Sequence, residues 1–284
     1  RHLNLTTRIW VPEDAPPWIA CNGWLDNAAS FDHIAPLLPD CRLLALDLPG
    51  HGLSDHRPPG TAYHFLDMVS ELFEVADHFG WERFSLLGHS MGAALATITA
   101  GTIPERISQL LLIEGLGPLA KPAEEAADIL RESNELWQAF PNKRMPQYVS
   151  ENVAVAARMN VNDMAESSVR ALVQRNLCPQ GERFTWRTDP RLKVHSRVYL
   201  TEAQVCAFLA NLRMPTLLIT GKHSALREWL DLIHSRIALV PTLEHVELNG
   251  GHHLHLDHPE PVAEALRQFL FRHPFISEHS LHLS

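Results

Sequence analysis

A single serine stands between two glycines at the point where an apolar run gives way to small residues. The stretch is FSLLGHSMGAALA, residues 84–96, with Ser90 between Gly88 and Gly92. In a tight strand-to-helix turn, the residues two positions before and after the serine must be small so that the strand and the helix can approach each other. The pattern therefore predicts a turn that holds the Ser90 hydroxyl clear of its own backbone, where it could act as a nucleophile.

Such a turn can also stabilise negative charge that develops beside the serine. The backbone N–H of Met91 and the N-terminus of the following helix would point toward an oxyanion that forms beside Ser90. A serine hydroxyl remains a weak nucleophile until a base takes its proton. The adjacent His89 is not expected to be that base, because a neighbouring side chain on so sharp a turn points away from the serine. We expect His89 to pack in the interior.

The candidate bases lie far along the chain, in the segment ELNGGHHLHLDHPEPV, residues 247–262. An apolar strand is expected to end near Asn249, and two glycines then make a bend before His252. A loop at the carboxyl end of the last strand could face the serine turn, so His252 is the predicted base and His253 the next candidate. His255 and His258 fall at the start of the last helix and are expected to be structural.

These residues need a scaffold, and the chain predicts one in which short buried strands alternate with helices. Such alternation indicates a mostly parallel sheet covered on both faces. The expected strands are 3–11, 17–21, 41–48, 83–88, 107–115, 215–221 and 243–253, and the expected helices of this core are 28–38, 65–80, 91–101 and 259–271.

The alternation is interrupted between residues 118 and 205. This stretch is polar and predicted to be helical, with the clearest helices at 123–140 and 163–177. We therefore divide the chain into a first core part (1–117), a helical cap or lid (118–205) and a second core part (206–284). A cap would lie over the carboxyl edge of the sheet, where ligands bind in α/β proteins. The alternative is a helical subdomain with no gating role.

Composition excludes several other classes of protein. The chain of 284 residues has 24 Lys and Arg against 33 Asp and Glu, a net charge of −9, and no basic stripe, which argues against nucleic-acid binding. No apolar stretch approaches the length of a membrane span. The cysteines lack CxxC spacing and predict a reduced, cytoplasmic protein rather than a disulfide framework or a zinc site: they are Cys21, Cys41, Cys178 and Cys206. The chain opens on Arg1, and nothing at its start is typical of a signal peptide.

At this point the residues resemble the α/β-hydrolase fold superfamily. The segments that carry the resemblance are GWLDNAASFD, ALDLPGHGLSD, GHSMGAALA, LLIEGLGP and GGHHLHLDHPEPV, in this order along nearly the whole chain. They are similar to the cap-bearing esterase, lipase and epoxide-hydrolase branch, and more narrowly to serine-hydrolase-like proteins. The resemblance implies a mostly parallel eight-stranded sheet flanked by helices, shortened here at its first strand, with a helical cap inserted between strands.

The resemblance also implies the chemistry. Ser90 would attack an ester carbonyl, His252 would relay the proton, and water would release the acyl group, with no metal and no organic cofactor. The family's oxyanion hole uses the N–H after the nucleophile, here that of Met91, and one from the loop after an early strand, here that of Trp24. Asn22 replaces the family's usual histidine in that loop. Because that histidine supports the loop rather than the oxyanion, we expect the function to be retained.

The acid is a second departure from the family pattern. Relatives most often place an Asp after the strand that follows the cap, but this chain has LLITGKHSALREW there, without a carboxylate before Glu228. Other members take the acid from the end of the preceding strand, where this chain has Glu114. A carboxylate at that place is costly to bury unless it is paired, and a histidine N–H is a suitable partner. Glu114 is thus the predicted acid, with Asp231 and Glu228 in reserve; the alternative is a Glu114 that pairs with an arginine or is solvated.

Several further residues are expected to be structural. Asp26 and Asn27 are predicted helix N-caps, and Arg187 is predicted to pair with a carboxylate. The loop that holds Asp47, His51 and Asp55 is expected to be shaped by those three side chains.

The resulting hypothesis is a monomeric or homodimeric serine hydrolase that acts on small, mostly uncharged acyl esters. A C–C bond hydrolase, a lactonase and a perhydrolase would use the same residues, so the sequence leaves them open. A binding protein that has lost activity on the same scaffold also stays open, since Asn22 and the missing Asp favour it.

Overall fold

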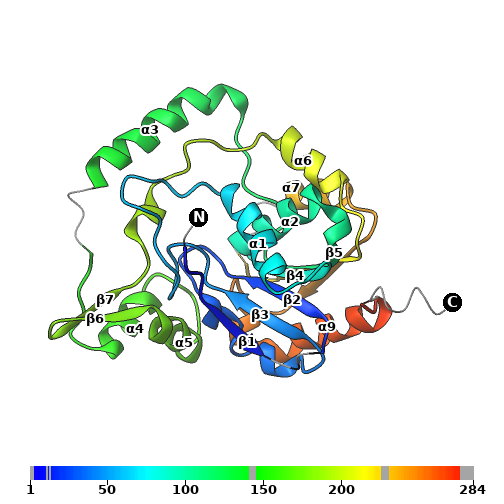
Figure 1. The fold of residues 1–284 in the computed structure, drawn as a ribbon, viewed down its shortest axis with the longest axis horizontal. Helices are drawn as coiled ribbons and strands as arrows, with labels where there is room; N and C mark the ends of the chain where they lie inside the picture. The colour runs from blue at the N-terminus through cyan, green and yellow to red at the C-terminus, as the bar shows by residue number, and fades with distance from the viewer. Residues whose placement is uncertain (1–2, 11, 13, 141–144, 225–229, 276–284) are drawn as a thin grey trace.

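Seven strands form the central sheet of the computed structural model, which describes residues 3–10, 12, 14–140, 145–224 and 230–275. Their order is β1-β3-β2-β4-β5-β8-β9, and all neighbours are parallel except the edge pair β1–β3 (Figure 1). The strands are β1 Thr7–Trp10, β2 Pro17–Cys21, β3 Arg42–Leu46, β4 Phe84–His89, β5 Ile107–Ile113, β8 Thr216–Gly221 and β9 Leu243–Leu248.

The expected doubly covered sheet is confirmed. Alternate residues of each strand point to opposite faces, so Ile19 and Cys21 of β2 join one buried cluster while Trp18 and Ala20 join another. The first cluster lies under α1 (Asp67–His78), α2 (Met91–Thr102), α6 (Glu202–Ala210) and α7 (Leu230–Ile237). The second lies under α8 (Leu254–Asp257), α9 (Pro259–Arg272) and two 3-10 turns, η1 (Ala28–Phe31) and η2 (Ala35–Leu37).

Two expectations about the core need correction. Among the described residues the central sheet has seven strands rather than the eight that the resemblance implies, and β1 is its antiparallel edge strand. The expected helix 28–38 is two 3-10 turns instead. Pro36 explains part of the difference, because proline has no N–H to donate within a helix and disturbs the turn before it.

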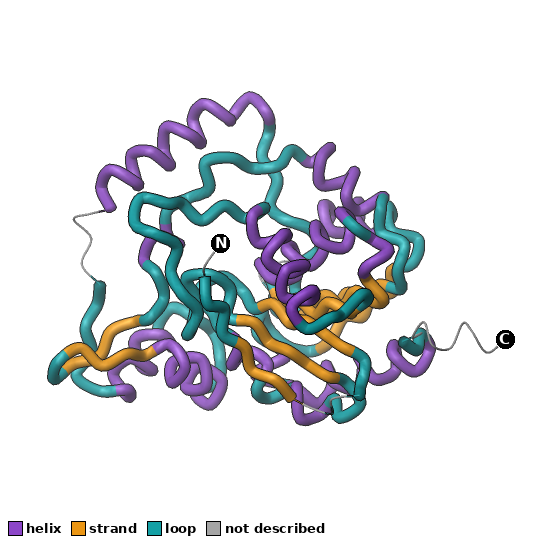
Figure 2. Tube along the Cα trace, viewed as in Figure 1, coloured by secondary structure: helices purple, strands orange, loops and turns teal. Residues whose placement is uncertain are grey.

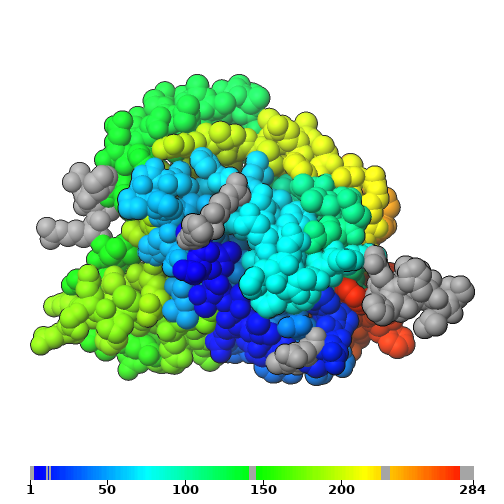
Figure 3. Space-filling view, viewed as in Figure 1, coloured from blue at the N-terminus to red at the C-terminus, as the bar shows by residue number. Residues whose placement is uncertain are grey.

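The segment 118–205, predicted to be helical, also contains a β-hairpin. It holds α3 (Ala126–Ala139), α4 (Glu151–Met159) and α5 (Glu166–Asn176), but α5 runs directly into an antiparallel hairpin of β6 (Leu177–Gln180) and β7 (Arg183–Trp186) (Figure 2). In the space-filling view, α3 lies apart from the α4–β7 part, and the loop around residues 50–66 is visible between them (Figure 3).

Buried ion pairs join this segment to the core. Asp47, which follows β3 and is fully buried, receives the Arg175 guanidinium at 2.8 Å and the backbone N–H groups of Ala28 and Leu53 at 2.7 and 2.9 Å. Asp47 thus shapes its loop as expected. Arg187, predicted to pair with a carboxylate, instead donates from Nε to the Leu177 carbonyl at 3.1 Å.

All four cysteines are free, and their surroundings predict how they react. Burial raises the pKa of the Cys21 and Cys41 thiols to about 12. Since the thiolate is the reactive species, we expect dithionitrobenzoate at pH 8 to modify only the partly exposed Cys178 and Cys206 in the native protein. All four should react in denaturant, and rapid native modification of more than two thiols would contradict this packing.

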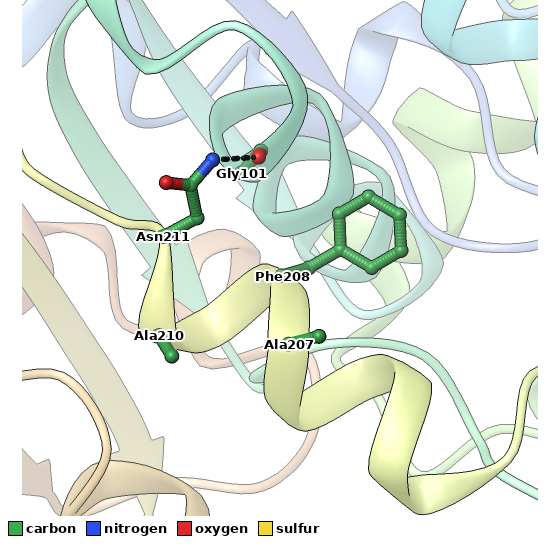
Figure 4. Close-up of a pocket in the computed structure, with 5 residues that line it drawn as sticks. All are labelled: Gly101, Ala207, Phe208, Ala210 and Asn211. Atoms are coloured by element: carbon green, nitrogen blue, oxygen red, sulfur yellow. Dashed lines mark hydrogen bonds between the residues drawn. The ribbon is translucent and has the colours of Figure 1, made fainter.

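One shallow depression of about 380 Å³ lies between α2 and α6 (Figure 4). It is lined by Gly101, Ala207, Phe208, Ala210 and Asn211, and the Asn211 amide donates to the Gly101 carbonyl at 2.7 Å. Because these residues carry no titratable or nucleophilic side chain, the depression is not a candidate catalytic site. No helix of the described chain has the length and apolar character needed to cross a membrane.

Candidate active site

The predicted site residues meet at one edge of the sheet. Ser90 follows β4, Glu114 follows β5 and His252 follows β9, and the four strands β4, β5, β8 and β9 are consecutive neighbours in the sheet. Because these strands are parallel, their carboxyl ends lie along the same edge, where α/β proteins place their ligand sites.

The turn at Ser90 has the strained geometry that its sequence predicts. Ser90 has φ 53° and ψ −115°, a conformation that non-glycine residues rarely adopt. Its N–H donates to the Ile113 carbonyl at 2.9 Å, and its own carbonyl accepts the Ala94 N–H at 3.0 Å. These bonds to β5 and α2 hold the strain in place, as is common at functional sites.

Gly92 shows why the second glycine is needed. A Cβ at this position would lie 1.9 Å from the Cys21 carbonyl oxygen, which is backbone and cannot move aside cheaply. We expect Gly92→Ala to destabilise the protein by about 3 kcal/mol or more, the upper range for overpacking. Urea denaturation followed by circular dichroism measures this. Gly251→Ala is the matched control, because an added Cβ there meets nothing within 4 Å; equal stability of the two variants would contradict the packing.

His252 lies between the serine and the glutamate. Its Nε2 is 3.0 Å from Ser90 Oγ, and its Nδ1 is 3.0 Å from Glu114 Oε2. A carboxylate oxygen can only accept, so Nδ1 carries the ring hydrogen and Nε2 presents a lone pair to the serine hydroxyl. The His252 side chain is 35% exposed, whereas the Glu114 side chain is fully buried. The structure thus brings together the three residues that the sequence singled out, in a base-oriented nucleophile geometry.

Among the described residues, Glu114 has three hydrogen-bond donors, none of them an arginine. Besides His252, the Gly221 N–H donates to Oε1 at 2.5 Å and the Ser224 hydroxyl donates to Oε2. Glu114 itself has φ 58°. Ser224 stands in the stretch after β8 where the family resemblance predicts an Asp, and it supplies a hydroxyl donor to Glu114. Nothing in the sequence around Ser224 predicts this role.

The reserve acids do not take this position. Asp231 is exposed on α7, and the carboxylate bonded to His252 is that of Glu114. Glu228 lies outside the described residues.

Hydrogen bonds to the Gly23 carbonyl fix the direction of the Trp24 N–H in the loop after β2. The buried Asn22 amide donates to the Gly23 carbonyl at 2.9 Å, and the Asp26 N–H donates to the same oxygen at 3.1 Å. In a trans peptide the N–H points opposite to the C=O, so the Trp24 N–H is directed away from Asn22. Met91 begins α2, and its N–H is one of the first-turn amides without a partner inside the helix. Asn22 therefore supports the loop whose Trp24 N–H is the predicted oxyanion donor.

Comparison with known proteins agrees with this fold and arrangement. The family model described as alpha/beta hydrolase fold matches residues 16–259. The chain belongs to the α/β-hydrolase family. It is 32% identical to a probable serine hydrolase of Drosophila melanogaster over 92% of this chain and 82% of that one, and 29% identical to serine hydrolase-like protein 2 of Homo sapiens over 94% and 90%.

Solved structures give the same result for this α/β hydrolase. A hypothetical protein from Pseudomonas aeruginosa is 40% identical, with a TM-score of 0.89 and 95% of each chain covered. The thioesterase domain from the curacin biosynthetic pathway is 27% identical, with a TM-score of 0.81 and coverage of 93% of this chain and 95% of that domain. Together these relatives support a hydrolase of the α/β fold.

A cavity of about 530 Å³ opens beside Ser90 and His252 in this α/β hydrolase. Its wall combines the loop at Trp24 with residues from the 118–205 segment, the predicted cap. The lining residues from that segment are Met145, Pro146, Tyr148, Ala157, Arg158, Val161, Asn162, Asn176, Trp186, Thr188, Pro190 and Lys193.

Two further histidines of this α/β hydrolase, His89 and His255, are buried beside His252. His89 is fully buried, and its Nε2 donates to the His252 carbonyl at 2.9 Å, so it packs in the interior as expected and also braces the base. Burial lowers the pKa of His89 well below its usual range. His255 is bonded to Ser30 Oγ at 2.9 Å, and burial lowers its pKa to about 3. The exposed His258 precedes α9.

Asp26 has a different role from the predicted N-cap. Asn27 caps η1 by accepting the Ala29 N–H, but Asp26 is buried and paired with Arg158 and with His253, whose Nε2 is 3.3 Å from Asp26 Oδ2. Burial alone would raise the pKa of Asp26, but the bond from His253 and the charge of Arg158 outweigh it and hold the pKa well below its usual range. His253, the second candidate base, is thereby engaged with Asp26 rather than with Ser90.

Proposed function

We propose that this α/β hydrolase cleaves small, mostly uncharged acyl esters through a covalent acyl-Ser90 intermediate. The observation that supports this most is the continuous chain of two 3.0 Å contacts from Ser90 Oγ through the His252 ring to Glu114. Such a chain activates a hydroxyl that is otherwise a weak nucleophile, and it has no evident structural purpose at an exposed cavity wall.

In the proposed reaction, His252 Nε2 takes the Ser90 proton as Oγ attacks the ester carbonyl carbon. The carbonyl electrons move to the oxygen, and the N–H groups of Met91 and Trp24 donate to the resulting oxyanion. Collapse of this intermediate breaks the bond to the alcohol, which leaves with the proton from His252. Water then attacks the acyl-enzyme with His252 again as base, and Ser90 is restored. Glu114 holds the ring tautomer and stabilises the imidazolium throughout.

The cavity supports a small substrate. Its volume of about 530 Å³ lies within the range of pockets for small molecules. Aromatic and aliphatic side chains, among them Trp24, Tyr148 and Trp186, contribute to its wall and suit an uncharged acyl chain. The four unpaired thiols suit a reducing compartment, and we propose a cytoplasmic location on that basis.

We also propose that segment 118–205 acts as a lid. The segment contributes to the cavity wall. Two side chains of the loop after β2 donate to backbone carbonyls of the segment: Trp24 Nε1 to the Leu192 carbonyl at 3.1 Å, and the Asn27 amide to the Leu172 carbonyl at 2.9 Å. A lid that excludes water from the site would account for these contacts. A helical subdomain without a gating role is the alternative.

Thioester hydrolysis is a second candidate, because a structural relative at 27% identity is a thioesterase domain. The same triad would also support lactone, C–C bond or perhydrolase chemistry. An inactive binding protein would keep the cavity without turnover.

A substrate panel tests the proposal. It comprises p-nitrophenyl acetate, butyrate and octanoate, an acyl thioester, a γ-lactone, a 1,3-diketone, and acetate with hydrogen peroxide, each assayed with the wild type and with Ser90→Ala. We expect saturable turnover with the highest kcat/KM on the acetyl or butyryl ester. Preference for one of the other substrates would replace the ester assignment. Absence of Ser90-dependent turnover on every member would contradict the proposal and favour the binding protein.

A further inference from the structure

Three buried side chains form a cluster directly behind the loop that precedes Trp24. They are Asp26, His89 and His253, and one ligand atom from each lies within 4.8 Å of the other two. Asp26 Oδ2 is 3.3 Å from His253 Nε2 and 4.0 Å from His89 Nδ1. In the part of the chain that the structure describes, this is the only such group of three or more His, Cys, Asp or Glu side chains. The reaction proposed above uses none of the three as a base or nucleophile.

His89 carries the independent observation. Its Nε2 is bonded to the His252 carbonyl, which can only accept, so Nε2 holds the ring hydrogen and Nδ1 presents a lone pair. That Nδ1 is buried and has no hydrogen-bond partner, and its nearest charged neighbour is Asp26 Oδ2. A lone pair facing a carboxylate oxygen in the interior is unfavourable, whereas an interposed cation makes both atoms ligands.

Gly23 leaves room at the same place. A Cβ on Gly23 would lie 3.0 Å from His89 Nδ1 and 3.1 Å from Asp26 Oδ2, so a side chain there would press against both atoms. Gly23, Asp26, His89 and His253 all line the 530 Å³ cavity, which gives an ion a route in from solvent.

We propose that Asp26, His89 and His253 bind one Zn²⁺ or a similar transition-metal cation, and that the bound ion inhibits the hydrolase. Two imidazoles and one carboxylate are ligands that Zn²⁺ and Cu²⁺ accept, whereas Ca²⁺ and Mg²⁺ prefer oxygen alone. The fourth position would be taken by water from the cavity. His253 binds through Nε2 in the tautomer that carries its hydrogen on Nδ1.

Supporting contacts for such an ion are in place. A metal-binding histidine usually donates its other ring N–H to a carbonyl or carboxylate, as His89 does to the His252 carbonyl. Asp26 uses Oδ1 for Arg158, which leaves Oδ2 for the ion.

Inhibition follows from what the cluster touches. Ligand bonds of about 2.0–2.2 Å to a tetrahedral ion place neighbouring ligand atoms about 3.4 Å apart. Asp26 Oδ2 and His253 Nε2, at 3.3 Å, already fit this spacing, so His89 Nδ1, at 4.0 Å from Asp26 Oδ2, is the atom that would have to move closer. The rings of His89 and His253 lie 4.9 and 5.1 Å from the His252 ring, and His89 holds the His252 carbonyl. Contraction of the cluster would therefore move the base away from its 3.0 Å contact with Ser90.

Binding is tested without reference to activity. The full chain, freed of metal with EDTA, is titrated with ZnCl₂ by calorimetry in a His279→Gln/His282→Gln background, which removes two histidines outside the described residues. We expect one ion per chain. His253→Gln should weaken binding by about 100-fold or more, since loss of even an outer-shell partner costs about 10–100-fold. Asp26→Asn should act in the same direction, and circular dichroism checks that each variant is folded.

Two further variants locate the ion. His245→Gln, which alters a histidine bonded to Thr220 away from the cluster, should bind Zn²⁺ as the parent does. His252→Gln should also retain binding; loss there would place the ion on the catalytic histidine and overturn the proposal. Absence of binding below about 100 µM Zn²⁺, or binding unchanged in His253→Gln, would overturn it as well.

The inhibition half rests on the proposed function. If an ester is turned over, Zn²⁺ should inhibit the parent once one ion is bound per chain. The Zn²⁺ concentration that halves the rate should be at least 10-fold higher for His253→Gln than for the parent, with the rate of each protein normalised to its own rate without Zn²⁺. Zn²⁺ binding without inhibition would overturn this half alone, while the binding titration stands even if no ester proves to be a substrate.

Discussion

Ser90→Ala is expected to reduce kcat on p-nitrophenyl butyrate by about 10⁶-fold, to a residual rate that stays above the buffer reaction. The variant loses the only atom that forms the covalent bond in the proposed reaction, while the oxyanion donors and the cavity remain. Substrate binding should persist, so the dissociation constant of a non-hydrolysable ester analogue should change little. Initial rates at saturating substrate measure the effect.

Ser108→Ala is the matched control for this change. Ser108 lies on β5, is buried, and has a hydroxyl without a hydrogen-bond partner, so its loss should leave kcat within about twofold. A Ser90→Ala enzyme that keeps more than about 1% of the parent rate would show that turnover does not pass through an acyl-Ser90 intermediate.

Glu114→Gln is expected to lower kcat by about 10⁴-fold, the cost of an orienting acid in a triad of this kind. Glutamine preserves the volume of the side chain, but its single carbonyl oxygen cannot accept from Gly221, Ser224 and His252 together. The amide N–H₂ would face His252 Nδ1 and favour the wrong ring tautomer. Since the acid touches no substrate, kcat should fall while KM changes by less than about threefold.

Asp231→Asn separates the two candidate acids. Asp231 is exposed on α7, and its amide variant should keep the parent kcat. The opposite result, a large loss in Asp231→Asn and near-normal turnover in Glu114→Gln, would assign the acid to Asp231 instead of Glu114.

Local sterics explain why much of the site could be predicted from the sequence. The Gly-x-Ser-x-Gly pattern constrains its own neighbourhood, because only a glycine at position 92 fits against the Cys21 carbonyl. The strands end where apolar runs end, and parallel pairing then places Ser90, Glu114 and His252 at one edge. Those placements depend on the chain order of the elements more than on the details of side-chain packing.

What the sequence could not show depends on partners far apart in the chain. The residue type and position of Asp26 predict an N-cap. In the structure Asp26 instead pairs with Arg158 and His253, which are 132 and 227 residues away in the chain. Ser224 donates to an acid 110 residues earlier, and a serine in a loop gives no sign of this in advance. The β6–β7 hairpin is a different case, because Pro179 and Gly181 are local signals for it that the helical prediction does not use.

The most direct test of the account is the site of covalent modification by a fluorophosphonate. The intact protein should gain one phosphonyl group, tandem mass spectrometry should place it on Ser90, and His252→Gln should slow labelling by at least about 10³-fold, because the hydroxyl then lacks its base. A wild type that stays unmodified, or an adduct on another residue, would contradict the proposal that Ser90, activated by His252, is the nucleophile.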